Sequence, residues 1–280
     1  MPQFDKNIIQ IWIQGCNNIT RDIYLQNKKN WKDFNPDWNY KCLGDVDLKK
    51  ICYQYSQDCG LAYENSKLVH TKVDLARVVF IYIYGGIYVD MDMYAFRPLS
   101  NNVELKNLIE RYNSGESPNV LGLSRNKTNF IESMLFTQSK NTLGNVITIS
   151  NRANPILKEY IDFMVTNITR VDTKLEKEFL INETTGPIIF NKFFNKNLIH
   201  GNKFKIDYEI FDPEIFEPCD VSGECSINNN TLAIHNFELS WISDKYKGLL
   251  NFYYSYKSII YFIVLYLILY IIKNTLLRSK

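Results

Sequence analysis

The sequence predicts an α/β domain followed by a separate apolar segment at the C-terminus. Of its 280 residues, 46% are hydrophobic and 14% aromatic, which is enough to build one sizeable core. Short apolar runs alternate with stretches of helical periodicity along most of the chain, as in proteins whose helices pack on a sheet. One long apolar run near the end stands outside this alternation.

The elements of the domain follow in chain order from these runs. Residues 8–13 are a short apolar run that lacks the features of a signal peptide and predicts a first buried strand. A helix is predicted over residues 21–34 and a short strand over 41–43. A long helix over 65–84 ends at Gly85 and Gly86, which can adopt the positive φ of a helix C-cap. A strand over 87–92 follows, and later we expect strands over 120–123 and 232–235 and helices over 154–167 and 187–194.

The C-terminal run has the composition of a membrane helix. Residues 259–272 are apolar or tyrosine without a break, but a helix of that length spans only about 21 Å of a hydrocarbon core of about 30 Å. Starting at Leu249 gives 24 residues, enough to cross if Lys257 reaches toward the headgroups. We therefore expect one domain over residues 1–248 and a single-pass membrane anchor over 249–280. The alternative is an amphipathic or buried terminal helix, and basic residues at both ends leave the orientation undetermined.

The charge distribution argues against one class of partner. The chain has a net charge of +2, but six of its 32 basic residues follow Asp244, where no acidic residue is found. The preceding part therefore carries 26 basic against 30 acidic residues. A body of this sign, with no basic stripe, lacks what binding to a phosphate backbone requires. Nucleic acid is not an expected partner.

The six cysteines show no CxxC pair and no repeated spacing with histidines, which argues against a zinc site. Cys219 and Cys225, in a polar loop that contains glycine, are the one pair expected to be able to form a disulfide. Free thiols are the expectation for the others: Cys16, Cys42, Cys52 and Cys59.

The most informative stretch is HTKVDLARVVFIYIYGGIYVDMDMY, residues 70–94. In a strand over 87–92, Asp90 and Asp92 point to the same face as Tyr88. Two carboxylates placed in this way repel each other unless a cation lies between them or a proton is shared. Mg²⁺ or Mn²⁺ prefers such oxygen ligands and keeps positions free for substrate phosphates. Without further context, a solvated strand end is the simpler interpretation.

Two residues of the preceding helix change this interpretation. Asp74 and Arg77 are three residues apart and so share a helix face. They are either a simple helix ion pair, or a carboxylate that grips sugar hydroxyls and a guanidinium that meets sugar and phosphate oxygens. The glycine pair lets the end of the helix approach the carboxylates closely.

The pattern KVDLARxxxxYxYGGIYVDMD resembles the DXD region of glycosyltransferase family 32. That family includes yeast α-mannosyltransferases of the outer chain and of inositol phosphorylceramide, and relatives of the large clostridial glucosylating toxins. IIQIWIQG near the start is similar to the family's first strand, where the usual motif has a histidine at the place of Ile9 or Gln10. TTGP (184–187) and AIHNFELSW (233–241) resemble later segments, so that the resemblance covers roughly residues 7–242.

The resemblance implies a GT-A fold, a Rossmann-like mixed sheet with the nucleotide at the C-terminal ends of its strands. It also implies transfer of a sugar from a nucleotide-sugar to a hydroxyl group, with retention at the anomeric carbon. On the donor side, Trp12 would border the nucleobase and Asp74 and Arg77 would bind the sugar. Tyr88 and Asp90 would contact the ribose or the sugar-phosphate.

On the metal side, the resemblance implies that Asp92 binds Mn²⁺ or Mg²⁺ directly, with Asp90 and His235 as further ligands. A lone histidine at the end of an apolar strand is otherwise a hydrogen-bonded core residue. Trp241 would close over the diphosphate, or else is a core or interfacial aromatic. The catalytic residues are accordingly expected to be Asp74, Arg77, Asp90 and Asp92, whereas Asn151 and Glu183 are weaker candidates.

The substrates implied are a nucleotide-sugar donor, GDP-mannose or a UDP-hexose, and a glycan or membrane glycolipid acceptor. No pair of carboxylates supplies a nucleophile and an acid for double displacement, so we expect a front-face mechanism in which the leaving diphosphate helps to deprotonate the acceptor. The sequence does not select the donor sugar or the acceptor.

Two other classes compete. A phosphatase of the haloacid-dehalogenase type also has a DxD strand end, but it should have Thr or Val two residues after the second aspartate and a later GDxxxD cluster. Tyr94 and Ala95 stand there instead, and no such cluster follows. The other class is a membrane-anchored carbohydrate-binding protein without catalysis, against which the set of donor-side residues argues.

Overall fold

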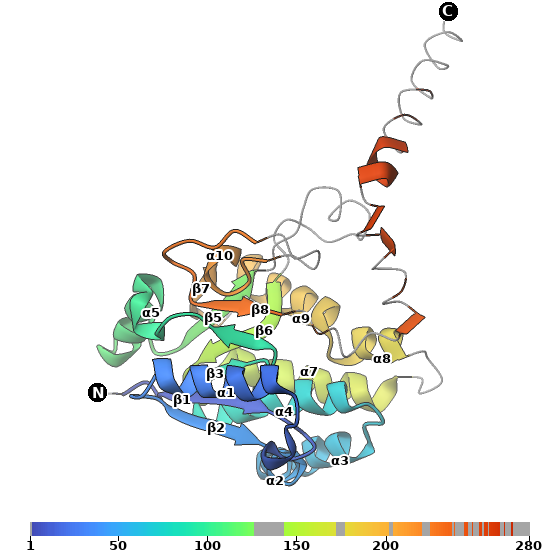
Figure 1. The fold of residues 1–280 in the computed structure, drawn as a ribbon. Coiled ribbons are helices and arrows are strands. Elements are labelled where there is room, and N and C mark those ends of the chain that lie inside the picture. The colour runs from blue at the N-terminus through green and yellow to red at the C-terminus, as the bar shows by residue number, and fades with distance from the viewer. Residues whose placement is uncertain are drawn as a thin grey trace, which may run out of the picture. The chain divides into compact units, whose positions relative to one another are not determined.

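The computed structural model describes residues 2–125, 143–171, 177–201, 204–219, 225–236, 238, 244, 245 and 248, and part of residues 252–270. It divides into two compact units, Met1–Glu238 and Leu239–Lys280. The first unit contains every named helix and strand (Figure 1).

A mixed sheet with the strand order β2-β1-β3-β6-β5-β7 forms the centre of the first unit. Its strands are β1 (Asn7–Ile11), β2 (Asn39–Leu43), β3 (Gly86–Val89), β5 (Val120–Arg125), β6 (Leu143–Ser150) and β7 (Asp207–Phe211). β1 pairs in parallel with β2 and β3, whereas β6 runs antiparallel to both of its neighbours. A two-stranded sheet joins β4 (Met93–Ala95) to β8 (Ala233–His235).

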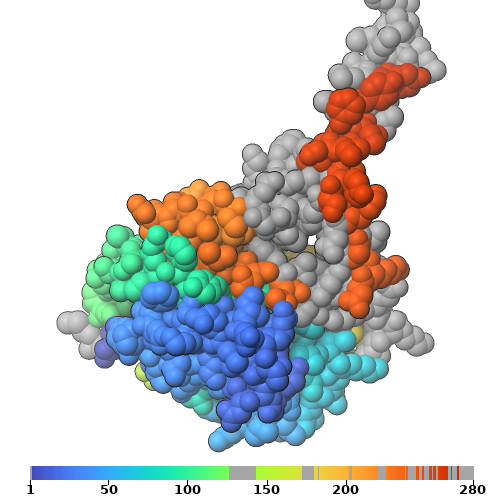
Figure 2. Space-filling view, in the orientation of Figure 1, coloured from blue at the N-terminus to red at the C-terminus, as the bar shows by residue number. Residues whose placement is uncertain are grey.

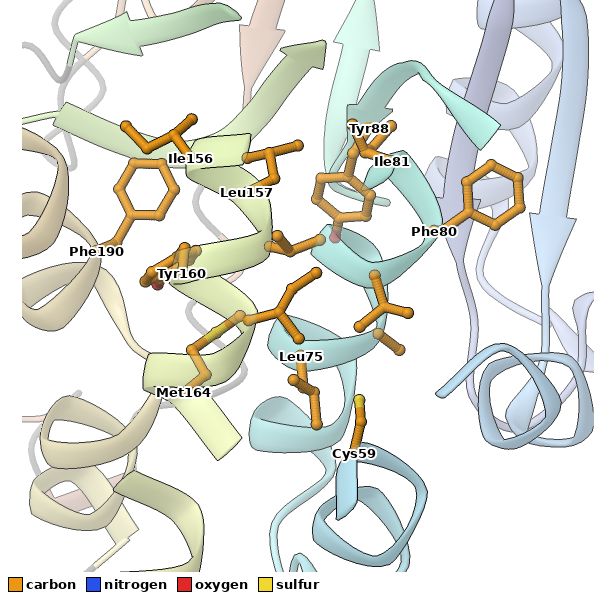
Figure 3. Packing of buried hydrophobic residues seen from close by; sticks show 14 of the residues in the cluster. Cys59, Leu75, Phe80, Ile81, Tyr88, Ile156, Leu157, Tyr160, Met164 and Phe190 are labelled. Carbon is orange, nitrogen blue, oxygen red and sulfur yellow. The ribbon is translucent and has the colours of Figure 1, made fainter. Parts of the chain in front are cut away.

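Successive residues of the strands supply two separate cores because side chains alternate between the faces of a sheet. Ile9 belongs to one core and Ile8 to the other. The first core packs on α2 (Asp45–Tyr55), α3 (Gln57–Asn65), α4 (Val69–Tyr84), α7 (Pro155–Arg170) and α9 (Pro187–Phe194). Figure 3 shows side chains of α7, among them Tyr160 and Met164, beside Leu75 of α4.

The opposite face of the sheet is covered by α1 (Asp22–Phe34), α5 (Val103–Asn113) and α10 (Pro213–Phe216), through Trp31, Leu108 and Phe216 among others. α8 (Lys177–Thr184) precedes α9, and three short helical turns complete the unit: η1 (Cys16–Asn18), η2 (Leu99–Asn101) and η3 (Asn195–Ile199). The prediction of a mixed α/β domain is confirmed.

The strand predicted over 87–92 is wrong at its end. β3 stops at Val89 because the carbonyl of Asp90 accepts a hydrogen bond from the Met93 N–H (3.1 Å), which closes a turn before β4 begins. Asp90 and Asp92 therefore lie in a turn and not on one face of a strand. The helix predicted over 65–84 starts later than expected, since Asn65 is the last residue of α3 and α4 starts at Val69.

The expectation of free thiols is wrong for Cys16 and Cys42, which form a disulfide. Cys42 lies opposite Gln10 in the parallel pairing of β1 and β2, and the loop after β1 brings Cys16 to the same end of the sheet. Cys219 and Cys225 form a second disulfide, as the sequence allowed. Cys52 and Cys59 are buried thiols.

No helix among the described residues is long and apolar enough to cross a membrane. Much of the predicted anchor, residues 249–280, lies outside the described residues. The division into residues 1–248 and 249–280, and the single-pass anchor, therefore stay predictions.

Candidate active site

Helix α4 places Asp74 and Arg77 inside the protein. Both are buried, and Arg77 Nη2 lies 2.5 Å from Asp74 Oδ1. The Thr185 hydroxyl, just before α9, donates to Asp74 Oδ2 at 2.9 Å. Both oxygens of this carboxylate thus have partners, as a buried charge requires. The two residues were predicted to share a face of one helix, and the structure pairs them.

Gly85 and Gly86 turn the chain directly from α4 into β3. Both have positive φ, 66° and 113°, which glycine adopts at little cost. A Cβ on Gly86 would lie 2.4 Å from the carbonyl oxygen of Asn7 in β1. Only glycine therefore lets β3 leave the helix so close to its neighbouring strand.

This short connection brings Asp90 against the end of Arg77. Arg77 Nη1 lies 3.3 Å from Asp90 Oδ1, and the Tyr88 hydroxyl donates a hydrogen bond to the same oxygen. The Arg77 guanidinium also lies 5.0 Å from the centre of the Tyr88 ring, a cation–π distance. Asp74, Arg77, Tyr88 and Asp90 thus form one connected network, and their predicted roles in binding the donor stay predictions.

Asp92 meets His235 because β4 pairs with β8. Met93 lies opposite His235 in this pairing, and His235 Nε2 is 3.2 Å from Asp92 Oδ2. The backbone N–H of Glu238 donates to the same oxygen at 3.1 Å. One ligand atom from each of Asp90, Asp92 and His235 lies within 4.8 Å of the others.

These three residues fit a divalent cation. Two carboxylates and one imidazole converge from two elements far apart in sequence, and carboxylates suit Mg²⁺ or Mn²⁺ while an imidazole is a common ligand of transition metals. The metal ligands predicted from the sequence are therefore close together, although a turn and not a strand places the two aspartates.

Burial and neighbouring charges shift the pKa values in this cluster. Burial, reinforced by the Asp92 charge, raises the pKa of Asp90 to about 6 despite the opposing effect of Arg77. Burial alone would lower the pKa of His235, but the Asp92 carboxylate outweighs it and raises the value to about 10. Conversely, burial disfavours the charge on Asp92, but His235 holds the pKa of Asp92 below its usual range. Without a metal ion, an imidazolium thus balances Asp92.

Sequence reasoning missed Glu217, which lies on the other side of His235. Glu217 Oε2 is 3.7 Å from His235 Nδ1, and Ser124 donates to Glu217 Oε1 at 2.7 Å. The Glu217 side chain is only 2% exposed. Glu217 follows α10 and precedes His235 by 18 residues, and no sequence motif marks it as a site residue.

Trp12 follows β1 and lies near the turn that holds the two aspartates. Its ring centre is 4.9 Å from that of Tyr24 in α1, and both pack with Met91. Arg21 pairs with Glu238 through both terminal guanidinium nitrogens, Nη1 and Nη2, at 2.6 and 2.9 Å. Figure 2 shows blue N-terminal atoms beside orange atoms from the last part of the first unit.

The remaining candidates are placed differently. Trp241 lies outside the described residues. Asn151 is buried and accepts a hydrogen bond from the Val120 N–H at 2.8 Å, which gives it a structural role between β5 and β6. Glu183 is exposed on α8 and no described contact connects it to the cluster.

Residues 22–114 match the model of the glycosyltransferase sugar-binding region containing the DXD motif. This range runs from α1 to α5 and includes Asp74, Arg77, Asp90 and Asp92. Residues 22–114 of this chain therefore form a sugar-binding region of the DXD-motif glycosyltransferase type. The resemblance predicted from the sequence is thereby confirmed.

Two curated relatives agree with this domain. The chain is 29% identical over 110 residues to the initiation-specific alpha-1,6-mannosyltransferase of Candida albicans, covering 38% of this chain and 29% of that protein. It is 31% identical over 123 residues to an uncharacterised glycosyltransferase of Acanthamoeba polyphaga mimivirus, covering 39% and 47%. The chain thus matches less than half the length of each.

Among solved structures, the PaToxG glycosyltransferase matches with a TM-score of 0.46 and 16% identity, over 72% of this chain and 75% of that one. Mouse xyloside xylosyltransferase 1 matches with a TM-score of 0.43 and 7% identity, over 84% and 99%. These likenesses are remote, and the fold is defined here by its own strand order.

Proposed function

We propose that this DXD-motif domain is a metal-dependent, retaining glycosyltransferase that transfers a hexose from a nucleotide-sugar to a hydroxyl group. The observation that carries the proposal is the convergence of Asp90, Asp92 and His235 within 4.8 Å, joined through Asp90 to the buried Asp74–Arg77 pair. The sheet is of the mixed kind that the GT-A assignment requires.

Asp90, Asp92 and His235 would hold the metal ion. Because the set contains an imidazole beside two carboxylates, Mn²⁺ is the first ion to test and Mg²⁺ the second. The ion supplies charge neutralisation for a diphosphate leaving group. GDP-mannose and UDP-hexoses are both candidate donors.

The protein's own residues would orient the donor. Arg77 is fixed between Asp74 and Asp90 and over the Tyr88 ring, so its remaining N–H groups have a set direction toward sugar or phosphate oxygens. Asp74 is only 9% exposed, so its first effect is to hold Arg77 in place. Trp12 and Tyr24 form an aromatic pair beside the turn, which suits a nucleobase.

Retention is the proposed stereochemical outcome, by reaction on one face of the sugar. Among the described residues, each carboxylate of the network is bonded to Arg77, Thr185, Tyr88 or His235. None of these is placed as a free nucleophile, which favours the front-face route in which the leaving phosphate accepts the acceptor's proton.

A glycan or a membrane glycolipid is the proposed acceptor, and residues 249–280 are the proposed membrane anchor. Described residues of that segment keep apolar side chains exposed, including Ile259, Phe262 and Tyr266. An anchored enzyme would meet acceptors at a membrane surface.

The test is a donor screen with the full chain. GDP- and UDP-sugars are supplied with Mn²⁺, and nucleoside diphosphate release is followed for the wild type, Asp92→Ala and the control Asp37→Ala, which removes an exposed carboxylate. We expect metal-dependent release from one donor, lost only in Asp92→Ala. Glycan binding without release from any donor would instead favour the non-catalytic carbohydrate-binding alternative, and full turnover in Asp90→Asn or Asp92→Asn would exclude the metal assignment.

A further inference from the structure

The turn that carries the two aspartates is held from its core side by side chains that the proposed chemistry does not use. Gln10 of β1 donates from Nε2 to the carbonyl oxygen of Asp90 at 3.0 Å. Asn27 of α1 donates from Nδ2 to the carbonyl of Met91 at 2.9 Å, and Trp31 from Nε1 to that of Met93 at 2.9 Å.

The remaining carbonyl of the turn also has a donor. The N–H of Asn236, next to His235, donates to the carbonyl of Asp92 at 3.0 Å. Every carbonyl from residue 90 to 93 therefore accepts a hydrogen bond from a donor outside this segment, and side chains provide three of these four bonds. A turn of this length needs only its own backbone bond, here from Met93 N–H to Asp90.

These hydrogen bonds fix the orientation of the side-chain amides of Gln10 and Asn27. A carbonyl oxygen can only accept, so the atoms that face Asp90 and Met91 must be the NH₂ groups of Gln10 and Asn27. The contact of the Gln10 amide oxygen supports the same orientation, because the Tyr40 hydroxyl donates to Oε1 at 2.7 Å. Burial raises the pKa of Tyr40 well above its usual range, which keeps this hydroxyl protonated.

Asn27 lowers the stability of the folded protein through one of its buried atoms. Its side chain is completely buried, and its Oδ1 has no hydrogen-bond partner among the described residues. An unpartnered buried acceptor costs about 1–3 kcal/mol. Asn27 and Trp31 are four residues apart on α1, so both face the same side of the helix and reach the turn together.

We propose that Gln10, Asn27 and Trp31 are positioning residues that hold the Asp90–Asp92 turn in its metal-binding shape before the ion arrives. This rests on the proposed metal site. Residues that orient metal ligands from outside typically change metal affinity about 10–100-fold when they are replaced. The role also accounts for a completely buried glutamine among the apolar residues of β1.

The experiment compares Asn27→Ala with Asn154→Ala. Asn154 is also completely buried and donates from Nδ2 to a backbone carbonyl, that of Val120 at 3.0 Å, but it does not touch the turn. Mn²⁺ affinity is measured by calorimetry on the full chain, and hydrogen exchange is measured over residues 88–96 without metal. We expect Mn²⁺ binding to weaken about tenfold or more, and exchange to accelerate, in Asn27→Ala only.

Trp31→Phe, which removes the Nε1 donor and keeps a smaller aromatic ring in the core, repeats the test should Asn27→Ala fail to fold. If the wild type binds Mn²⁺ and both variants bind it as tightly, or if Asn154→Ala weakens binding equally, the positioning role is wrong and the metal site stands. If the wild type itself binds no Mn²⁺, the metal site and the positioning role are both wrong.

Discussion

At the scale of single residues, Gly86 decides how closely the helix that carries Arg77 can approach the strand that leads to Asp90. Its φ is +113°, and a Cβ there would meet the backbone of Asn7, which is fixed between two paired strands. Neither strain can be relieved without moving β1.

Gly86→Ala should therefore destabilise the protein by about 3 kcal/mol or more, because backbone strain and a clash add. Gly115→Ala is the matched control: its φ is +80°, but a Cβ there would meet nothing within 4 Å. We expect only about 1 kcal/mol of backbone strain in that variant. Urea unfolding measures both, and equal losses would contradict the close approach of β3 to β1.

Glu217 would act on the proposed metal site through His235. A carboxylate beside the outer nitrogen of a metal-binding histidine fixes the ring and increases its basicity. Glu217→Ala should thus weaken Mn²⁺ binding about 10–100-fold, and Glu217→Gln, which keeps an acceptor oxygen for Ser124 or His235, should weaken it less. Calorimetric titration gives the affinities, with Glu214→Ala in the preceding helix α10 as control. A graded effect separates orientation of His235 from a general loss of folding.

At the scale of elements, β7 is joined to α5 by one acidic residue. Asp207 accepts hydrogen bonds from Arg111 Nε at 2.5 Å and from the Ser117 hydroxyl at 2.7 Å. Burial disfavours the charge on Asp207, but these two donors outweigh it and hold its pKa below the ordinary value. Glu209, two residues along the same strand, has its pKa raised by burial and by the Glu104 charge.

These opposite shifts predict opposite effects of pH. Because the folded pKa of Asp207 is depressed, its stabilisation is complete above the unfolded value of about 3.9 and is lost as pH falls through the folded value. Asp207→Asn should therefore lose stability at pH 7 and fall less between pH 5 and 3 than the wild type.

For Glu209, whose pKa is raised, the charged form destabilises the folded state once pH exceeds the folded value. Glu209→Gln should consequently gain stability at pH 7 and change little at pH 3. Urea unfolding at pH 7 and pH 3 gives the free energy of unfolding of both variants. Changes of the same sign in the two variants at pH 7 would contradict the opposite pKa shifts of Asp207 and Glu209.

The elements that carry the site were predictable from sequence, and the turn that shapes it was not. α4 and β3 follow from apolar periodicity and from the glycine pair, and α9 from Pro187 to Phe194 matches its prediction in full. The period-2 pattern of residues 87–92 continues through the turn, so it cannot show that the Asp90 carbonyl turns back to Met93. β6, in the middle of the sheet, was missed entirely.

Site residues whose contacts are distant in sequence were not predicted for a different reason. Glu217, Gln10 and Asn27 act through contacts with residues 18 to 80 positions away, and no local pattern records such contacts. His235 was found only because a family resemblance named its place. The Cys16–Cys42 disulfide likewise depends on the parallel pairing of β1 and β2.

At the scale of the whole molecule, the first unit holds every described residue of the proposed site. Its last residues include His235 and Glu238, and Glu238 both pairs with Arg21 and donates to Asp92. The proposed anchor begins only at residue 249. Donor turnover and membrane attachment should therefore be separable by a cut after residue 248.

The described residues of the second unit show why attachment is expected. Ile259, Phe262 and Ile263 are 57%, 73% and 51% exposed, and burying one such side chain fully is worth about 1.5–3 kcal/mol. A lipid bilayer supplies that burial. The full chain should thus stay with phosphatidylcholine vesicles after an alkaline wash, whereas residues 1–248 should be released.

Both proteins should release nucleoside diphosphate from the same donor at the same rate in detergent, because the truncation keeps His235, Glu238 and the pairing of β4 with β8. A truncated protein that still sediments with vesicles would move the membrane contact into the first unit. One that is folded by circular dichroism but inactive would instead show that residues beyond 248 complete the site.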